Sequence, residues 1–169
     1  MNMVEIADRN SLKTLPLPRQ RAKLNFVRTF TEQEFDCLAH GLIPKSMDDK
    51  WFIFMENDVL SFHRSWTGVC IYQVHFDKRH AITAVWVNRD VQQYKETDNE
   101  YDQRLLNFLI DNLLLGQSTP FPMPSNLPGS LPKGAFQHTV SRTGYPKKRD
   151  QEKETLRTKV LRIFGRKSN

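Results

Sequence analysis

The stretch Lys50–Phe76, KWFIFMENDVLSFHRSWTGVCIYQVHF, decides the predicted fold. It contains runs of Val, Ile, Phe, Tyr and Trp, the residue types that are enriched in strands. We expect strands at 51–55, 59–64 and 69–76, with a turn at Glu56-Asn57-Asp58 between the first two. Short connections of this kind join antiparallel strands, because parallel pairing needs a long crossover.

The flanking sequence adds strands and helices to this sheet. Alternation predicts a short strand at 26–30, and a further strand is expected at 81–87. A capping box at Thr31–Glu34 opens a helix at 32–40, and a second one at Thr97–Glu100 opens a long helix at 98–115. The predicted class is α+β: an antiparallel four- to five-stranded meander covered by one long helix, with a short N-terminal helix and a flexible basic C-terminal tail.

Composition divides the 169 residues into four parts. We expect a flexible N-terminal arm at 1–24, a single α+β domain at 25–116, a Pro/Gly-rich linker at 117–146 and a basic tail at 147–169. The tail holds nine Lys and Arg against three Asp and Glu, while the other residues hold 16 of each sign. The basic character therefore belongs to the tail, whose apolar residues have the spacing of a short amphipathic helix. Two roles for the tail remain. It binds nucleic acid, an anionic surface or an acidic partner, or it only makes the chain more soluble.

Several classes of protein are disfavoured by the sequence. No run approaches the roughly 18 apolar residues of a membrane span, and the N-terminus lacks the apolar region of a signal peptide. The two cysteines, Cys37 and Cys70, cannot form a disulfide framework, so we expect a cytoplasmic protein with reduced thiols. Neither zinc-ligand spacing nor a Gly-rich phosphate loop is present, and no metal or cofactor is predicted.

Polar residues at the end of the 59–64 strand form the first candidate site. His63, Arg64 and Ser65 are followed by Trp66 and Thr67. Arginine binds phosphate as a fork of donors, and histidine serves as a general acid or base. We predict a nucleotide or anion site with His63 as a catalytic residue and Arg64, Ser65, Trp66 and Thr67 as ligand-binding residues. Two alternatives remain: Arg64 caps a loop, and Trp66 plugs the sheet edge instead of stacking on a ligand ring.

Side-chain alternation divides this strand between two faces. If its apolar residues face the helix, then Ser61 and His63 point to the opposite face. The same alternation on the next strand puts Gln73 and His75 beside them, so the four side chains would line one polar patch. A solvated outer face has the same pattern, because one-sided antiparallel sheets alternate in this way.

The loop after the 81–87 strand is the second candidate site. Asn88 and Arg89 are predicted as ligand-binding residues that join Arg64, and Asp90 as a second catalytic residue. The alternative is an Asx-turn that leads into the helix. The acidic residues of the helix start are interpreted as dipole and solubility charges: Asp98, Glu100 and Asp102.

One extended pattern resembles a known family. KWFI…FHRSWTG-x-CIY…NRD-x-x-QY…T-D-x-EYD…LL…LI-x-x-LLLG runs from Lys50 to Gly116 and is similar to a family of small bacterial and phage proteins. Members are sometimes labelled ADP-ribosyl-(dinitrogen reductase) hydrolase. The well-understood ADP-ribosylglycohydrolases are larger, all-helical and hold two Mg²⁺ ions, so an activity of this kind would need a different scaffold here.

Two classes of function follow from these observations. The first is binding or hydrolysis of a nucleotide-type ligand, which the resemblance relates to ADP-ribose; an enzyme would then be an ADP-ribosyl-hydrolase-like hydrolase. The second is a non-enzymatic interaction module whose basic tail contacts nucleic acid, membrane or an acidic partner. The sequence leaves open whether the chain is an enzyme.

Overall fold

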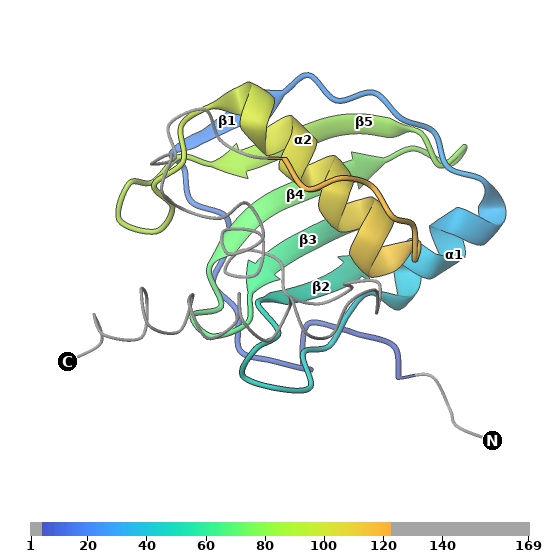
Figure 1. Ribbon diagram of the computed structural model, residues 1–169, viewed down its shortest axis with the longest axis horizontal. Coiled ribbons are helices and arrows are strands. Elements are labelled where there is room, and N and C mark those ends of the chain that lie inside the picture. Colours follow the sequence, from blue (N-terminus) through green and yellow to red (C-terminus); the bar gives the residue numbers. More distant parts are fainter. Residues whose placement is uncertain (1–4, 123–169) are drawn as a thin grey trace.

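A computed structural model describes residues 5–122, which form a sheet and a covering helical layer (Figure 1). The five strands are antiparallel and lie in the order β1-β5-β4-β3-β2, so the predicted α+β class with an antiparallel sheet is confirmed. The strands are β1 (Arg21–Leu24), β2 (Trp51–Glu56), β3 (Val59–Arg64), β4 (Cys70–Phe76) and β5 (Ile82–Asn88). The helices are α1 (Glu32–His40) and α2 (Asn99–Leu109), and α2 continues into a π-helical turn, η1 (Ile110–Leu114).

Strands β2 to β5 form the predicted meander. Asn57 and Asp58 have φ values of 52° and 58°, the pair of positive angles that a type I′ hairpin turn requires. This turn sets the β2–β3 register, in which Glu56 pairs with Val59 and Trp51 pairs with Arg64. The observed bounds of β3 and α1 equal the predicted ones.

The strand predicted at 26–30 is wrong. The N-terminal strand is β1, whose residues Arg21 and Leu24 pair with Asn88 and Val85 of β5. Within 26–30 only Thr29 makes a bridge, to Ala81. Residues 21–24, which the sequence assigns to a flexible arm, are thus part of the sheet. Charged residues are common on edge strands because they discourage further pairing, and they mask a strand signal at RAKL.

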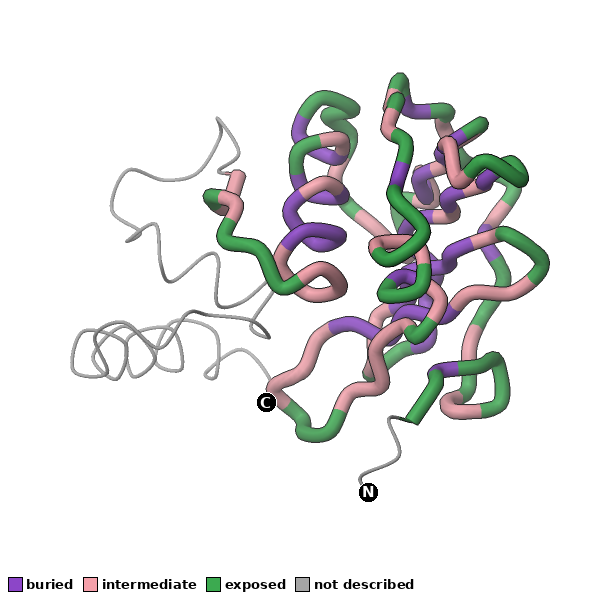
Figure 2. Tube along the Cα trace, turned by 90° about the vertical axis from the view of Figure 1, so that its right-hand side faces the viewer, coloured by how far each residue is buried: buried purple, intermediate pink, exposed green. Residues whose placement is uncertain are grey.

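The hydrophobic core lies between the sheet and α2 (Figure 2). Leu105 and Leu109 are at most 2% exposed, whereas Leu113 in the π-helical turn is half-buried. On the sheet, Trp51 and Phe62 pack against the ring of Tyr72 at centroid distances of 6.2 and 6.1 Å. The apolar stripe predicted for the long helix therefore faces the sheet, with its last residue at the margin.

The second predicted capping box is wrong. The N-cap of α2 is Asp98, whose Oδ1 accepts hydrogen bonds from the amides of Glu100 and Tyr101. Thr97 caps nothing there; its own amide donates to Glu96 Oε1. An Asp accepts as well as a Thr at an N-cap, so a Thr-Asp pair leaves the start of a helix ambiguous by one residue.

The chain returns along α2 after the helix ends. Thr119 exchanges hydrogen bonds with the Asn112 side chain, and Phe121 packs edge-on against Phe108 at 4.9 Å. Nearby, Arg28 Nη1 lies 2.8 Å from Asp111 Oδ1 and forms an ion pair with it. The two groups are not oriented for a hydrogen bond, and Asp111 Oδ1 has no hydrogen-bond partner among the described residues. Most of the predicted linker and all of the predicted basic tail lie outside the described residues.

Candidate functional site

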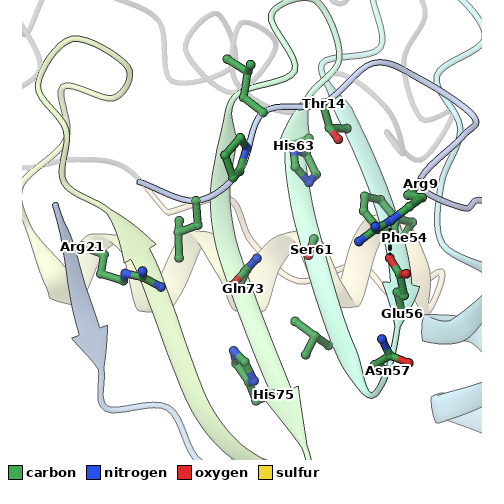
Figure 3. Close-up of a pocket in the computed structure, with 14 residues that line it drawn as sticks. Arg9, Thr14, Arg21, Phe54, Glu56, Asn57, Ser61, His63, Gln73 and His75 are labelled. Carbon is green, nitrogen blue, oxygen red and sulfur yellow. Dashed lines mark ion pairs between the residues drawn. The ribbon is translucent and has the colours of Figure 1, made fainter. Parts of the chain in front are cut away.

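The face of the sheet opposite α2, called the outer face below, carries a cavity of about 640 Å³. Its floor includes Ser61 and His63 from β3 and Gln73 and His75 from β4 (Figure 3). The polar patch predicted from alternation is therefore present. The other lining residues come from the β2–β3 hairpin and from the N-terminal segment: Phe54, Glu56, Asn57, Val59, Arg9, Thr14, Leu15, Pro16, Leu17 and Arg21.

Residues 5–20, called the arm below, supply one wall of this cavity. Backbone hydrogen bonds hold the arm at three points: Ala7 N to His40 O at 2.9 Å, Leu15 N to Gly68 O at 2.9 Å, and Arg89 N to Gln20 O at 2.8 Å. Within the arm, Ala7 and Leu17 are buried. The cavity is thus bounded by residues of the anchored arm on one side and by strand residues on the other.

Gly68 allows the arm to approach the sheet closely. Its φ is +74°, a conformation that side-chain-bearing residues rarely adopt, and a Cβ there would lie 2.6 Å from the carbonyl oxygen of Lys13. The Gly in the predicted Trp66-Thr67-Gly68 turn therefore serves the packing of the arm as well as the turn itself.

His63 is the most buried titratable group of the cavity, with 4% exposure. Its Nδ1 lies 2.9 Å from the carbonyl oxygen of Gly68, so Nδ1 carries the proton and donates. Nε2 is then a hydrogen-bond acceptor. The ring stacks on Phe54 at 5.4 Å, and burial lowers the pKa of His63, against the opposing effect of the Gly68 carbonyl. His63 is therefore neutral at pH 7.

The charges at the cavity are unequally distributed. Arg9 Nε pairs with Glu56 Oε2 at 2.7 Å, so these two charges largely cancel. Arg21 reaches over the Trp86 ring, 5.8 Å from its centroid, and has no carboxylate at ion-pair distance among the described residues. Burial, followed by the charge of Arg21, lowers the pKa of His75. The described lining residues therefore carry a net positive charge, located at Arg21.

Arg64 does not join His63. Adjacent residues of a strand point to opposite faces, and Arg64 lies on the α2 side with its guanidinium 4.9 Å from the Trp51 ring centroid. Burial lowers the pKa of Arg64, and the nearby hydroxyls of Tyr94, Tyr72 and Tyr101 oppose this effect. Alternation along the strand places the two residues on opposite faces, so Arg64 does not line the cavity that contains His63.

Ser65 and Trp66 make hydrogen bonds to the 46–50 segment, and Thr67 makes one within the β3–β4 turn. Ser65 Oγ donates to the carbonyl of Asp49 at 2.5 Å, and Thr67 Oγ1 accepts from the amide of Val69. Trp66 Nε1 donates to the carbonyl of Met47 at 2.9 Å, while 60% of the residue stays exposed. These bonds join the β3–β4 turn to the 46–50 segment, and none of the three residues lines the outer cavity.

The Asn88-Arg89-Asp90 segment has a positioning role in the structure. Asn88 is fully buried and its Nδ2 donates to Cys70 O and Gln93 Oε1. Asp90 forms an Asx-type turn in which its Oδ1 accepts from the Gln92 amide. The structure therefore has the turn that the sequence offered as the alternative, and Asp90 does not line the cavity that contains His63.

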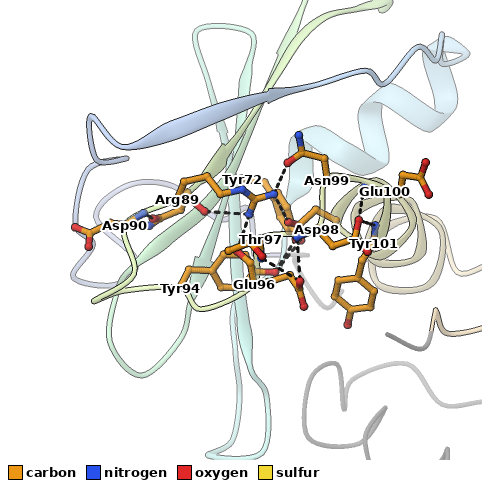
Figure 4. A network of polar contacts seen from close by, with 12 residues as sticks. Tyr72, Arg89, Asp90, Tyr94, Glu96, Thr97, Asp98, Asn99, Glu100 and Tyr101 are labelled. Atoms are coloured by element: carbon orange, nitrogen blue, oxygen red, sulfur yellow. Dashed lines mark hydrogen bonds and ion pairs between the residues drawn. The ribbon is translucent and has the colours of Figure 1, made fainter. Parts of the chain in front are cut away.

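Arg89 belongs to a buried network that the sequence did not predict (Figure 4). Asp102, with no exposed surface, accepts from Arg89 Nη2 at 2.7 Å and from the hydroxyls of Tyr72 and Tyr94 at 2.6 Å each. Burial raises the pKa of Asp102, and these three donors oppose that rise. Desolvation likewise raises the pKa of Tyr72 well above its usual value. The network ties α2, β4 and the 89–94 loop together.

The interpretation of Asp102 as a solubility charge is wrong. It lies on the same helical stripe as Leu105, Leu106 and Leu109, at spacings of three, four and seven residues. A carboxylate inside an apolar stripe is the signal that indicates burial with a partner. Asp98, in contrast, caps the helix, and Glu100 is exposed in its first turn.

Residues 5–122 contain no group of three or more His, Cys, Asp or Glu side chains that could hold a metal ion. Within the same residues, no helix has the length and apolar character needed to cross a membrane. Cys37 is exposed and Cys70 is buried; both are free, and burial raises the pKa of the Cys70 thiol to about 12.

Comparison with family models, curated proteins and solved structures finds no match for this chain. The resemblance carried by the Lys50–Gly116 pattern therefore stays a prediction.

Proposed function

We propose that the outer-face cavity binds a small phosphorylated ligand of the nucleotide type. The observation that carries the proposal is the row of Ser61, His63, Gln73 and His75 in one cavity that also contains Arg21, which has no ion-pair partner among the described residues. Its volume of about 640 Å³ lies within the range of ligand sites, roughly 300–1,000 Å³. The row offers hydrogen-bond donors and acceptors, and Arg21 offers a fork suited to phosphate.

The cavity supports binding better than it supports hydrolysis. Glu56 is the one carboxylate among its lining residues, and it is engaged by Arg9. His63 Nε2 is an acceptor that can take a proton from water, but no acidic residue orients its ring; Gly68 O does so instead. ADP-ribose is one ligand of the proposed class, in line with the family resemblance, and its hydrolysis is a separate proposal that binding alone does not require.

The test is a thermal-shift titration of the full chain with ADP-ribose, AMP and inorganic phosphate. A ligand at 100 times its Kd should stabilise the fold by about 2.7 kcal/mol. Gln73→Trp places an indole in the middle of the cavity and should abolish this shift. Lys23→Trp is the matched control, because Lys23 lies in the same row of the outer face but does not line the cavity. Equal shifts in both variants would reject the site.

The interaction-module function is a second proposal, and it rests on the basic tail at 147–169, which lies outside the described residues. A chain that ends at Pro122 keeps the contact of Thr119 with Asn112 in η1 and that of Phe121 with Phe108 in α2. If this shortened chain binds the ligand as the full chain does, the outer-face site is independent of the tail. If binding is lost, the tail has a part in it, and the proposal for the cavity alone is wrong.

A further inference from the structure

The two ends of the outer-face cavity differ in charge. At the β2 end, Arg9 and Glu56 form an ion pair beside Asn57, so this end is polar and nearly neutral. At the β1 end, Arg21 has no acidic partner among the described residues. Figure 3 shows Arg9 and Arg21 on opposite sides of the Ser61–Gln73 row. Among residues 5–122, a ligand that spans the cavity therefore meets a cation without an acidic partner at the Arg21 end and an ion pair at the other.

The neutral end also has an aromatic side chain in its lining, Phe54. His63 and Phe54 stack with an interplanar angle of 10°, and Phe54 lies beside the Arg9–Glu56 pair (Figure 3). The part of Phe54 that lines the cavity offers an apolar contact to an aromatic or sugar ring. An ion pair at the rim can both donate and accept, which matches the mixed donors and acceptors of a base edge or of sugar hydroxyls.

We propose that the ligand is a nucleoside or sugar monophosphate bound in one direction, with its terminal phosphate at Arg21 and its uncharged ring at Phe54 and the Arg9–Glu56 pair. This inference rests on the proposed function and narrows it. A phosphate at the end of the ligand meets Arg21, with Gln73 and His75 as neighbouring hydrogen-bonding groups. A diphosphate in the middle of a ligand, as in ADP-ribose, would lie over the neutral row and away from the cation.

This binding direction predicts that changes at Arg21 and at Arg9 will affect the affinities for different ligands. Arg21→Gln should weaken AMP and inorganic phosphate at least tenfold, about 1.4 kcal/mol, and leave adenosine unchanged. Arg9→Gln should weaken AMP and adenosine by similar factors and leave inorganic phosphate unchanged. Arg79→Gln, an exposed guanidinium in the β4–β5 turn, is the matched control and should change none of the three affinities.

The experiment is isothermal titration of the full chain and these variants with AMP, adenosine, inorganic phosphate and ADP-ribose, with each variant's fold checked by circular dichroism. Tighter binding of AMP than of ADP-ribose, with the split between the arginines, supports the direction. Tighter binding of ADP-ribose, or equal losses of AMP in both arginine variants, overturns the direction but not the cavity. If the unmodified chain binds none of the four probes, the proposed function itself is wrong and the direction with it. Arg21→Lys adds a check, since it keeps the charge without the fork and should recover part of the phosphate affinity.

Discussion

Removal of the Asp102 carboxylate should destabilise the protein more than any single surface change. Asp102 has no exposed side-chain area, and its partner Arg89 is 15% exposed. In Asp102→Ala, two tyrosine hydroxyls lose an acceptor and a largely buried guanidinium loses its counter-charge. Breaking a buried pair by removal of one partner costs about 3–5 kcal/mol. At about 2–4 °C per kcal/mol for a chain of this size, the melting temperature should fall by roughly 6–20 °C.

The assay is urea unfolding of the single variants Asp102→Ala and Arg89→Ala and of the double variant. Because both single changes break the same pair, the double variant should cost clearly less than their sum, with a coupling of about 1 kcal/mol or more. The exposed Arg9–Glu56 pair has the same 2.7 Å separation, with 67% and 37% of its side chains exposed, and serves as the control. Its disruption should cost about 0–1 kcal/mol.

Two results would refute this reasoning. One is a loss below about 1 kcal/mol in Asp102→Ala, which would mean that water replaces the missing carboxylate at little cost. The other is strict additivity in the double variant, which would mean that the two side chains stabilise the fold independently.

The network stabilises a particular arrangement more than it adds net stability, since burial raises the pKa of Asp102 and so opposes its ionised form. We therefore expect Asp102→Leu combined with Arg89→Met to unfold closer to the unmodified chain than either single alanine variant.

Three further predictions concern the core, the arm and the histidine. Leu109→Ala should cost about 2–5 kcal/mol of unfolding free energy, whereas Val27→Ala, at a residue that is 94% exposed, should stay within about 0.5 kcal/mol. Gly68→Ala should displace the arm, since its Cβ would lie 2.6 Å from the carbonyl oxygen of Lys13. Proteolysis near Lys13 should then be faster than in the unmodified chain, and an unchanged cleavage rate would contradict the prediction. Burial lowers the pKa of His63 in the folded state, so the unfolded chain binds a proton at a higher pH than the folded chain does. The free energy of unfolding should therefore fall as the pH drops below about 6.5. His63→Gln should reduce that loss in thermal melts between pH 8 and 5. A pH dependence that is the same in His63→Gln would assign the effect to other groups.

The sheet was predictable because its sequence signals are local. The bounds of β3 follow from alternation between two turn signals, and the same alternation predicted the row of Ser61, His63, Gln73 and His75. Successive side chains of a strand alternate between the two faces of the sheet. Where one face is buried, this alternation alone determines the face of each residue. The polar half of the candidate site could therefore be found before the structure.

The arm and the buried network were not predictable in the same way. β1 is a four-residue edge strand with two basic residues, and its pairing with β5 depends on a contact between segments more than 60 residues apart. Arg21 enters the site through that long-range pairing, and Arg9 enters it through the packing of the arm. Asp102 carried a local signal in its apolar stripe, but its partners Tyr72 and Arg89 come from a strand and a loop that no spacing rule connects.

The most direct test of the central claim is an NMR titration of the isotope-labelled full chain with AMP. If the outer-face cavity is the ligand site, the largest chemical-shift changes should occur at the amides of β3 and β4 that carry Ser61, His63, Gln73 and His75, and at Arg21 in β1. Shifts confined to the α2 side, around Arg64 and Tyr94, or no saturable shifts up to millimolar AMP, would contradict the account.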